Sequence, residues 1–170
     1  MSVNLYKRIK NIIKKPEAPI QEKSVLDLEP GDIVDVSLVT YQVVGRTHHP
    51  QRNAVFLTLQ DGNDVAYLKI EKREQIQHEL YTAIDGRLDS FDEIPTTIEM
   101  DDVVYHLEEQ YSGQVLTAGN TPFSMAGEQY VWDFQSDDRK LLRIEWQDGR
   151  MMMYEGESVI PADVQVMRAT

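Results

Sequence analysis

One short pattern occurs twice in this chain: Tyr67-Leu68-Lys69-Ile70-Glu71 returns as Leu141-Leu142-Arg143-Ile144-Glu145. Upstream of each copy, the stretch VTYQV at residues 39–43 returns as VVYHL at residues 103–107. Similar segments that recur in the same order at a long period indicate a duplicated supersecondary unit. The sequence therefore predicts two related halves.

Short apolar runs separated by turn residues follow residue 26 in both halves. Asp61-Gly62-Asn63-Asp64 and Asp148-Gly149 are strong hairpin signals. Residues 72–84 are ambiguous, because Ile76, Leu80 and Ile84 have helical spacing; we assign a strand by analogy with the hairpin of the second half. No crossover helices separate the strands, which argues against a parallel α/β fold.

The predicted fold is all-β, an antiparallel β-sandwich or barrel built from two similar β-meander halves and preceded by a short N-terminal amphipathic helix. Whether the halves form one barrel or two lobes is open. We expect separate strands near residues 103–110 and 113–118, and a closing strand in the tail after Pro161. The predicted organisation is a basic helix at 1–15, a linker at 16–25, a first β repeat at 26–84, a connection at 85–95 and a second β repeat at 96–170.

The composition and charge of the chain exclude several classes of function. The chain has no cysteine, which excludes disulfides, thiol catalysis and cysteine-bound metal. We see no apolar run long enough to span a membrane and no signal peptide, so we expect a cytoplasmic protein. The formal charge of −12 is uneven: residues 1–23 carry six basic and two acidic residues, a net of +4, and the remainder carries −16. An acidic body should repel phosphates, so nucleic acid is not an expected partner.

The basic N-terminal segment is the one stretch with a clear mechanism. Its apolar residues have the spacing of one helical face, and its cations occupy the rest of the wheel. Such a helix can lie on an anionic membrane surface or enter the groove of a protein partner. Docking on its own acidic body is the alternative, which we rank slightly lower. The residues expected to bind are Leu5, Lys7, Arg8, Ile9, Lys10, Ile12, Ile13, Lys14 and Lys15.

No catalytic constellation, metal site or cofactor motif is recognisable. Adjacent His48 and His49 should point to opposite sides of an extended chain. Glu71 and Glu145 recur at equivalent positions, and we favour a solvated strand position for both over a shared polar cleft. A possible ligand cleft would comprise Glu71, Glu145, Tyr41, Tyr105 and Trp146, although core packing explains the aromatic residues better.

The motifs of the body resemble an uncharacterised bacterial family, domain of unknown function four-one-seven-eight. The similarity rests on residues 28–34 (LEPGDIV) and 41–45 (YQVVG) in the first half, and on residues 104–108 (VYHLE), 141–146 (LLRIEW) and 154–159 (YEGESV) in the second. It covers nearly everything after residue 26. One departure is Lys72, which stands where the second copy has Trp146.

The resemblance carries no established activity and no catalytic residues. It implies genomic neighbours that encode phage-shock-protein-A-like membrane-stress proteins, small predicted membrane proteins and aminopropyltransferases, and hence an envelope-stress or polyamine-linked system. We therefore expect a non-enzymatic accessory module that docks through its basic segment on the inner membrane surface or a protein partner. The alternative is a small cationic, polyamine-like ligand in an acidic cleft between the halves, and a third hypothesis is an enzyme that uses Glu71 or Glu145.

Overall fold

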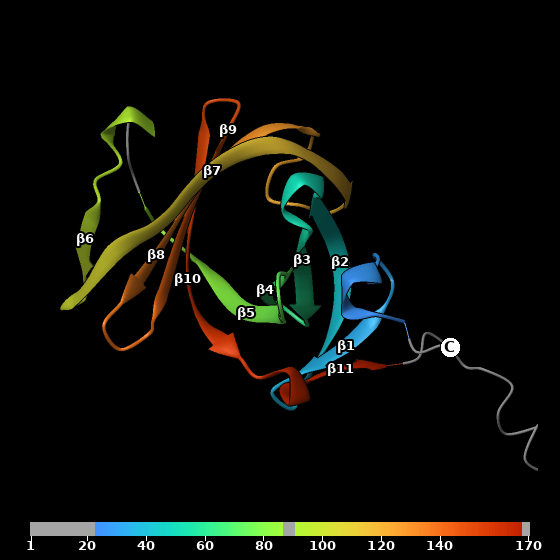
Figure 1. Ribbon diagram of the computed structural model, residues 1–170. Coiled ribbons are helices and arrows are strands. Elements are labelled where there is room, and N and C mark those ends of the chain that lie inside the picture. The colour runs from blue at the N-terminus through green and yellow to red at the C-terminus, as the bar shows by residue number, and fades with distance from the viewer. Residues whose placement is uncertain (1–22, 87–90, 168–170) are drawn as a thin grey trace, which may run out of the picture.

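The computed structural model describes residues 23–86 and 91–167 of the chain. These residues form antiparallel strands joined by short turns and four one-turn 3-10 helices, η1 (Val25–Asp27), η2 (Pro50–Arg52), η3 (Phe91–Glu93) and η4 (Pro161–Asp163) (Figure 1). The all-β prediction is confirmed. The predicted N-terminal amphipathic helix falls on residues 1–15, which lie outside the described part of the chain. Among those residues, the structure contains no helix that is long and apolar enough to cross a membrane.

The strands follow the predicted duplication. Each half is a meander of five strands, and β11 (Val164–Met167) returns to pair with β1. The first meander comprises β1 (Ile33–Val36), β2 (Val39–His49), β3 (Ala54–Asp61), β4 (Asp64–Lys72) and β5 (Ile76–Ile84). The second comprises β6 (Thr97–Met100), β7 (Val103–Gly119), β8 (Gly127–Ser136), β9 (Leu141–Gln147) and β10 (Arg150–Val159).

Equivalent turns open the two meanders. Ser37 and Leu38 join β1 to β2, and Asp101 and Asp102 join β6 to β7, with positive φ at all four residues. Two-residue turns of this kind match the twist of antiparallel strands. The turns predicted at Asp61–Asp64 and at Asp148-Gly149 are also present, and so are the strands assigned to residues 76–84 and to the tail.

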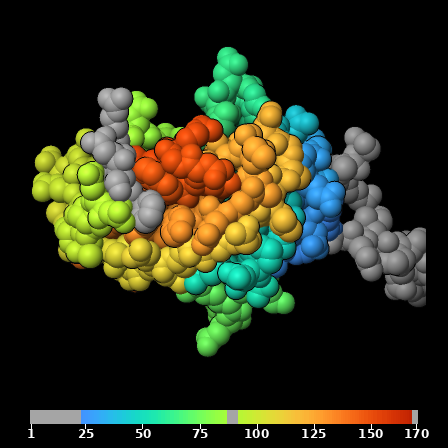
Figure 2. All heavy atoms as spheres, turned by 90° about the horizontal axis from the view of Figure 1, so that it is seen from above, coloured from blue at the N-terminus to red at the C-terminus, as the bar shows by residue number. Residues whose placement is uncertain are grey.

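The two meanders close into one barrel of eight strands, β2-β3-β4-β5-β10-β9-β8-β7. Equivalent strands meet at both seams, because β5 pairs with β10 and β7 returns to pair with β2. Pairing of like with like is what a twofold relation between the halves requires. In the space-filling view, segments from both halves form one continuous surface rather than two lobes (Figure 2).

One strand boundary differs from the prediction. Residues 103–119 form the single strand β7, not two strands at 103–110 and 113–118. The strand stays extended through Gly113 because it has partners along its length: β6 at its start, β8 in the middle and β2 at its end.

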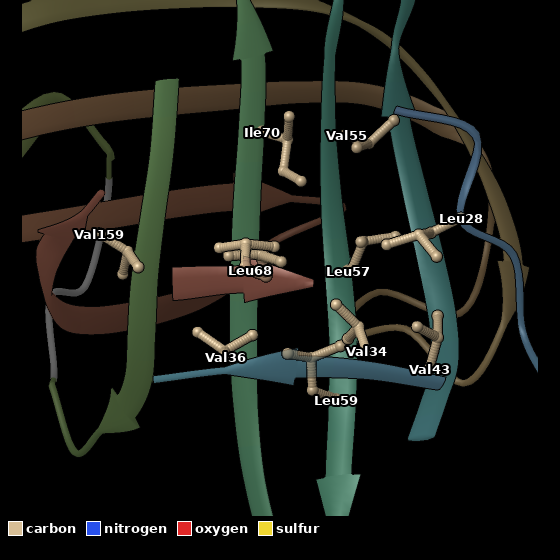
Figure 3. Packing of buried hydrophobic residues seen from close by; sticks show 11 residues of the cluster. Leu28, Val34, Val36, Val43, Val55, Leu57, Leu59, Leu68, Ile70 and Val159 are labelled. Atoms are coloured by element: carbon tan, nitrogen blue, oxygen red, sulfur yellow. The ribbon is translucent and has the colours of Figure 1, made fainter. Parts of the chain in front are cut away.

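Two apolar clusters lie outside the barrel wall. In the first, side chains of β1 lie against those of β3 and β4, and β1 crosses these strands in the close view (Figure 3). We call it the first outer core; it contains Leu28, Val34, Val36, Val43, Val55, Leu57, Leu59, Leu68, Ile70, Val159 and Val164. The second outer core packs β8 and β9 against β6 and the start of β7; its buried members are Tyr105, Trp132, Phe134, Leu142, Ile144 and Met153.

Candidate functional site

The duplicated motif points its charged residues into the barrel. Side chains alternate along a strand, so Leu68 and Ile70 enter the first outer core while Lys69 and Glu71 take the opposite face. Leu142 and Ile144 enter the second outer core in the same way, and Arg143 and Glu145 face inward. Glu71, Arg143 and Glu145 are each only 1% exposed. The solvated strand position that we favoured for the two glutamates is therefore wrong.

Arg143 is the centre of the interior network. Its Nε donates to Glu145 Oε2 at 3.0 Å, and its Nη1 donates to Asp133 Oδ1 at 3.3 Å and to the Tyr111 hydroxyl at 3.1 Å. The guanidinium also lies 4.9 Å from the centre of the Phe56 ring, on the far wall of the barrel. A planar cation with several donors suits such a site, because it can bind several acceptors at once.

Lys69, the equivalent of Arg143 in the first half, extends the network across the barrel. Its ammonium lies 3.2 Å from Glu79 Oε1 on β5 and 3.7 Å from Asp133 Oδ2 on β8. Burial alone would lower the pKa of Lys69, but Asp133 and Glu79 raise it above its ordinary value. Lys69 is therefore charged, and strands from both halves are joined by one set of ion pairs.

Glu71 belongs to a second set of charges. It pairs with Arg52 at 3.5 Å and with Arg73, and both arginines also pair with Glu109 on β7. The guanidinium of Arg52 lies 4.1 Å from the centre of the Tyr111 ring. Because Tyr111 also accepts a hydrogen bond from Arg143, its side chain links the two sets.

The two carboxylates beside Arg143 respond differently to burial. Burial raises the pKa of Asp133, but Lys69 and Arg143 outweigh it and hold that pKa below its ordinary value. Burial dominates at Glu145 and raises its pKa, although Arg143 opposes the shift. His49, another inward residue, has its pKa lowered to about 3, first by burial and then by the charges of Arg143 and Lys69, so its imidazole is neutral.

This arrangement is suited to holding strands of the two halves together. Its cations and carboxylates neutralise one another, and aromatic rings fill the remaining space: Phe56 stacks on Tyr67 at 5.4 Å, and Tyr154 meets both rings edge-on. Within the described residues, no group of three or more His, Asp or Glu side chains is arranged to hold a metal ion.

The structure does not bring together the five residues of the predicted ligand cleft. Glu71 and Glu145 line the barrel interior and contact different partners. Tyr41 packs against the first outer core, whereas Tyr105 and Trp146 belong to the second. The residues predicted to bind a membrane or partner, Leu5 to Lys15, lie outside the described part of the chain.

A groove does lie between the halves. It has a volume of about 440 Å³, with β5 and β10 on one side and the turn between β6 and β7 on the other. Asp101, Glu155 and Glu157 supply carboxylates, and Lys140 supplies one cation. Of the predicted cleft residues only Tyr105 lines it; burial, then Glu155 and Asp101, raise the pKa of its phenol.

Sequence reasoning missed most of the interior network, including Lys69, Glu79, Tyr111, Asp133 and Arg143. One signal was available. The repeat conserves a cation two residues before each glutamate, at Lys69 and at Arg143, and alternation puts each pair on one face. Tyr67 and Phe56 also alternate onto that face, which is unusual for a solvated surface.

These features define a duplicated, closed antiparallel β-barrel with a charged interior. The family model for the domain of unknown function DUF4178 matches residues 29–161, and the chain belongs to this family. Comparison with curated proteins and with solved structures finds no match.

Proposed function

We propose that this protein is a non-enzymatic interaction module that docks through its basic N-terminal segment on an anionic membrane surface or a protein partner. The observation that carries the proposal is the separation of charge: residues 1–23 have a net charge of +4 on a chain whose remainder carries −16. A lysine close to an anionic surface contributes on the order of 1 kcal/mol to binding, and the segment has several.

The barrel supports this proposal as a rigid acidic scaffold. Its reactive charged side chains are buried and paired: Glu145 pairs with Arg143, and Glu71 pairs with Arg52 and Arg73. A dissolved substrate would reach them only if the barrel opened. The acidic surface would also repel most of the body from an anionic membrane, so that the basic segment makes the main contact. In a bacterial cell, such a module would act at the cytoplasmic face of the membrane.

The test compares the binding of the wild-type chain to anionic vesicles with that of a variant that combines Ile9→Asp and Ile12→Asp. We expect binding to be lost, since two carboxylates would interrupt the apolar face that enters the headgroup region. The matched control is Leu38→Asp with Ile160→Asp, which adds the same charge at exposed apolar residues of the barrel. High salt should also weaken binding. If the Ile9/Ile12 variant binds vesicles and partners as well as the wild type does, the docking mechanism is wrong.

A second function, binding of a small cationic ligand such as a polyamine, is favoured by the groove between the halves. Carboxylates stand on both of its sides, at Asp101 and at Glu155 and Glu157, and they face the phenol of Tyr105. Spaced carboxylates beside an aromatic ring suit an extended polycation.

Calorimetry with spermidine tests this second function. Saturable binding by the full chain should weaken about tenfold in Asp101→Asn with Glu155→Gln, and stay unchanged in Asp61→Asn with Asp64→Asn, which removes the same charge from the exposed β3–β4 hairpin. Absence of saturable binding, or equal losses in both variants, would reject the groove as a polyamine site.

A further inference from the structure

A basic pocket lies on the outer face of the first meander, although the body is strongly acidic. It has a volume of about 440 Å³ and is bordered by η1, by β2 and by the ends of β3 and β4. Arg46 and His48 enter it from β2, and Lys72 and Arg73 stand at the end of β4. Asp27 is its one carboxylate residue.

Alternation along the strands explains how these cations reach one surface. Thr47 and His49 of β2 are buried toward the barrel, so Arg46 and His48 face outward. Lys72 continues the outward series of Leu68 and Ile70 on β4. Its backbone N–H donates to Asn53 O at 3.0 Å, which fixes the end of β4 beside the turn that precedes β3.

Two cations of this pocket, Arg46 and Lys72, differ from those inside the barrel because no carboxylate of the described residues pairs with them. Arg46 donates from Nη2 to the carbonyl of Leu26 at 3.0 Å, a neutral acceptor that positions the guanidinium without cancelling its charge. Neither Arg46 nor Lys72 forms an ion pair with a carboxylate of the described residues. By contrast, Arg73 is paired with Glu71 and Glu109.

The pKa of the neighbouring His48 imidazole also responds to the excess of positive charge in this pocket. Burial lowers the pKa of His48, and the charge of Arg46 lowers it further. An anion bound between these groups would relieve this repulsion. The buried Nε of Arg46 has no hydrogen-bond partner within the described residues, and a bound acceptor that shifts the guanidinium could satisfy it.

We propose that Arg46, His48 and Lys72 form a binding site for a phosphate monoester. A guanidinium and an ammonium that lack acidic partners match the two negative charges of such a group. Val55 and Leu26, which also border the pocket, offer apolar contact to the substituent that the phosphate carries. Either a soluble phosphate ester or the headgroup of phosphatidic acid presents this chemistry.

The site shares no residue with the basic N-terminal segment, so the experiments can refute one proposal without refuting the other. The soluble probe is glycerol 3-phosphate, added to the full chain and followed by the His48 ring resonances in NMR spectra. We expect saturable shifts whose dissociation constant rises about tenfold or more in Lys72→Glu. Arg139→Glu is the matched control, because it makes the same charge change at an exposed cation that borders neither the pocket nor the groove.

The membrane arm uses vesicles that contain either phosphatidic acid or phosphatidylserine. Of the two lipids, only phosphatidic acid exposes a phosphate monoester, so its advantage over phosphatidylserine should disappear in Lys72→Glu and persist in Arg139→Glu. Binding of glycerol 3-phosphate identifies a soluble source, and binding restricted to phosphatidic acid identifies a lipid source. If neither probe is affected by Lys72→Glu more than by Arg139→Glu, the pocket is not a phosphate site. If the Ile9/Ile12 variant loses all vesicle binding but keeps the glycerol 3-phosphate shifts, the phosphate site is supported independently of the N-terminal segment.

Discussion

Replacement of Arg143 by methionine tests the role of the charged barrel interior most sharply. The change keeps an unbranched side chain of similar length but removes the guanidinium that binds Glu145, Asp133 and the Tyr111 hydroxyl. Asp133 would retain Lys69 at 3.7 Å, whereas Glu145 would lose its cationic partner inside the barrel. Removing one partner of a buried ion pair costs about 3–5 kcal/mol.

For a chain of this size, each kcal/mol corresponds to about 2–4 °C in melting temperature, so Arg143→Met should melt about 6–20 °C below the wild type. Calorimetry and urea unfolding both measure the loss. Arg139→Met is the control: Arg139 is exposed on a hairpin, so its replacement should change stability by about 0.5 kcal/mol or less.

A double variant separates pairing from packing. Arg143→Met with Glu145→Leu removes both charges, so the carboxylate is no longer left alone, and we expect the double variant to be more stable than Arg143→Met by about 1–3 kcal/mol. A loss below about 1 kcal/mol in Arg143→Met, or a double variant that is less stable than the single one, would refute the assigned role of this network.

The stability of Arg143→Met should also depend on pH, and the ionisation of Glu145 sets the sign of that dependence. Its raised pKa means that the folded state holds the proton more tightly than the unfolded state, so Glu145 costs stability at neutral pH and the cost falls on acidification. Without Arg143 that pKa should rise further. The deficit of Arg143→Met should therefore shrink as the pH falls from neutral toward the raised folded pKa of Glu145. A deficit that grows on acidification would contradict this assignment.

Three further predictions concern folding. Gly45→Ala should strongly destabilise the barrel, because an added Cβ would overlap the backbone carbonyl of Asn120 where β2 meets β7. Gly127→Ala is the control in thermal melts, because its Cβ would meet only the Gln147 amide nitrogen, at 3.3 Å, and no backbone atom. Leu38→Asn should raise the free energy of unfolding by about 1 kcal/mol in urea, because Leu38 is 99% exposed and holds φ at +71°, a conformation that asparagine tolerates better. Asp133→Asn should reduce the loss of stability on acidification. The lowered pKa of Asp133 contributes stability above its unfolded value of 3.8, and this contribution is lost as the pH falls through the folded pKa. An unchanged acid transition would count against this role of Asp133.

The fold was largely accessible from the sequence because its determinants are local. The repeat at residues 67–71 and 141–145 identified the two meanders, and the glycine-containing turns at Gly62 and Gly149 positioned two hairpins. Closure into one barrel was not accessible. It depends on pairings between distant strands, β2 with β7 and β5 with β10, which no local pattern encodes.

The position of Glu71 and Glu145 could not be deduced for a related reason. Alternation shows that each glutamate lies opposite an apolar face, and in a single-layer sheet the polar face meets water. Here the strands beyond the barrel, β1 and β11 on one side of the sheet order and β6 on the other, cover the apolar faces from outside, and closure then encloses the polar faces. The sequence identifies the two faces, but only the tertiary arrangement decides which one lines the interior.

The groove and the basic pocket were inaccessible for the same reason. Asp101 lies in the turn after β6 and Glu155 in β10, whereas Arg46 and Lys72 lie in β2 and β4. Only the tertiary arrangement and the strand register bring the members of each pair to a common pocket. The basic N-terminal segment, by contrast, can be recognised from the composition of residues 1–23 alone, and the proposal of docking rests on that composition.

Co-sedimentation with anionic vesicles, for the full chain and for a chain that begins at Glu22, tests the central proposal most directly. The proposal predicts that the full chain sediments with the vesicles, that the shortened chain stays in the supernatant, and that neither binds zwitterionic vesicles. Retention of vesicle binding by the shortened chain, or absence of binding by the full chain to both vesicles and protein partners, would contradict it.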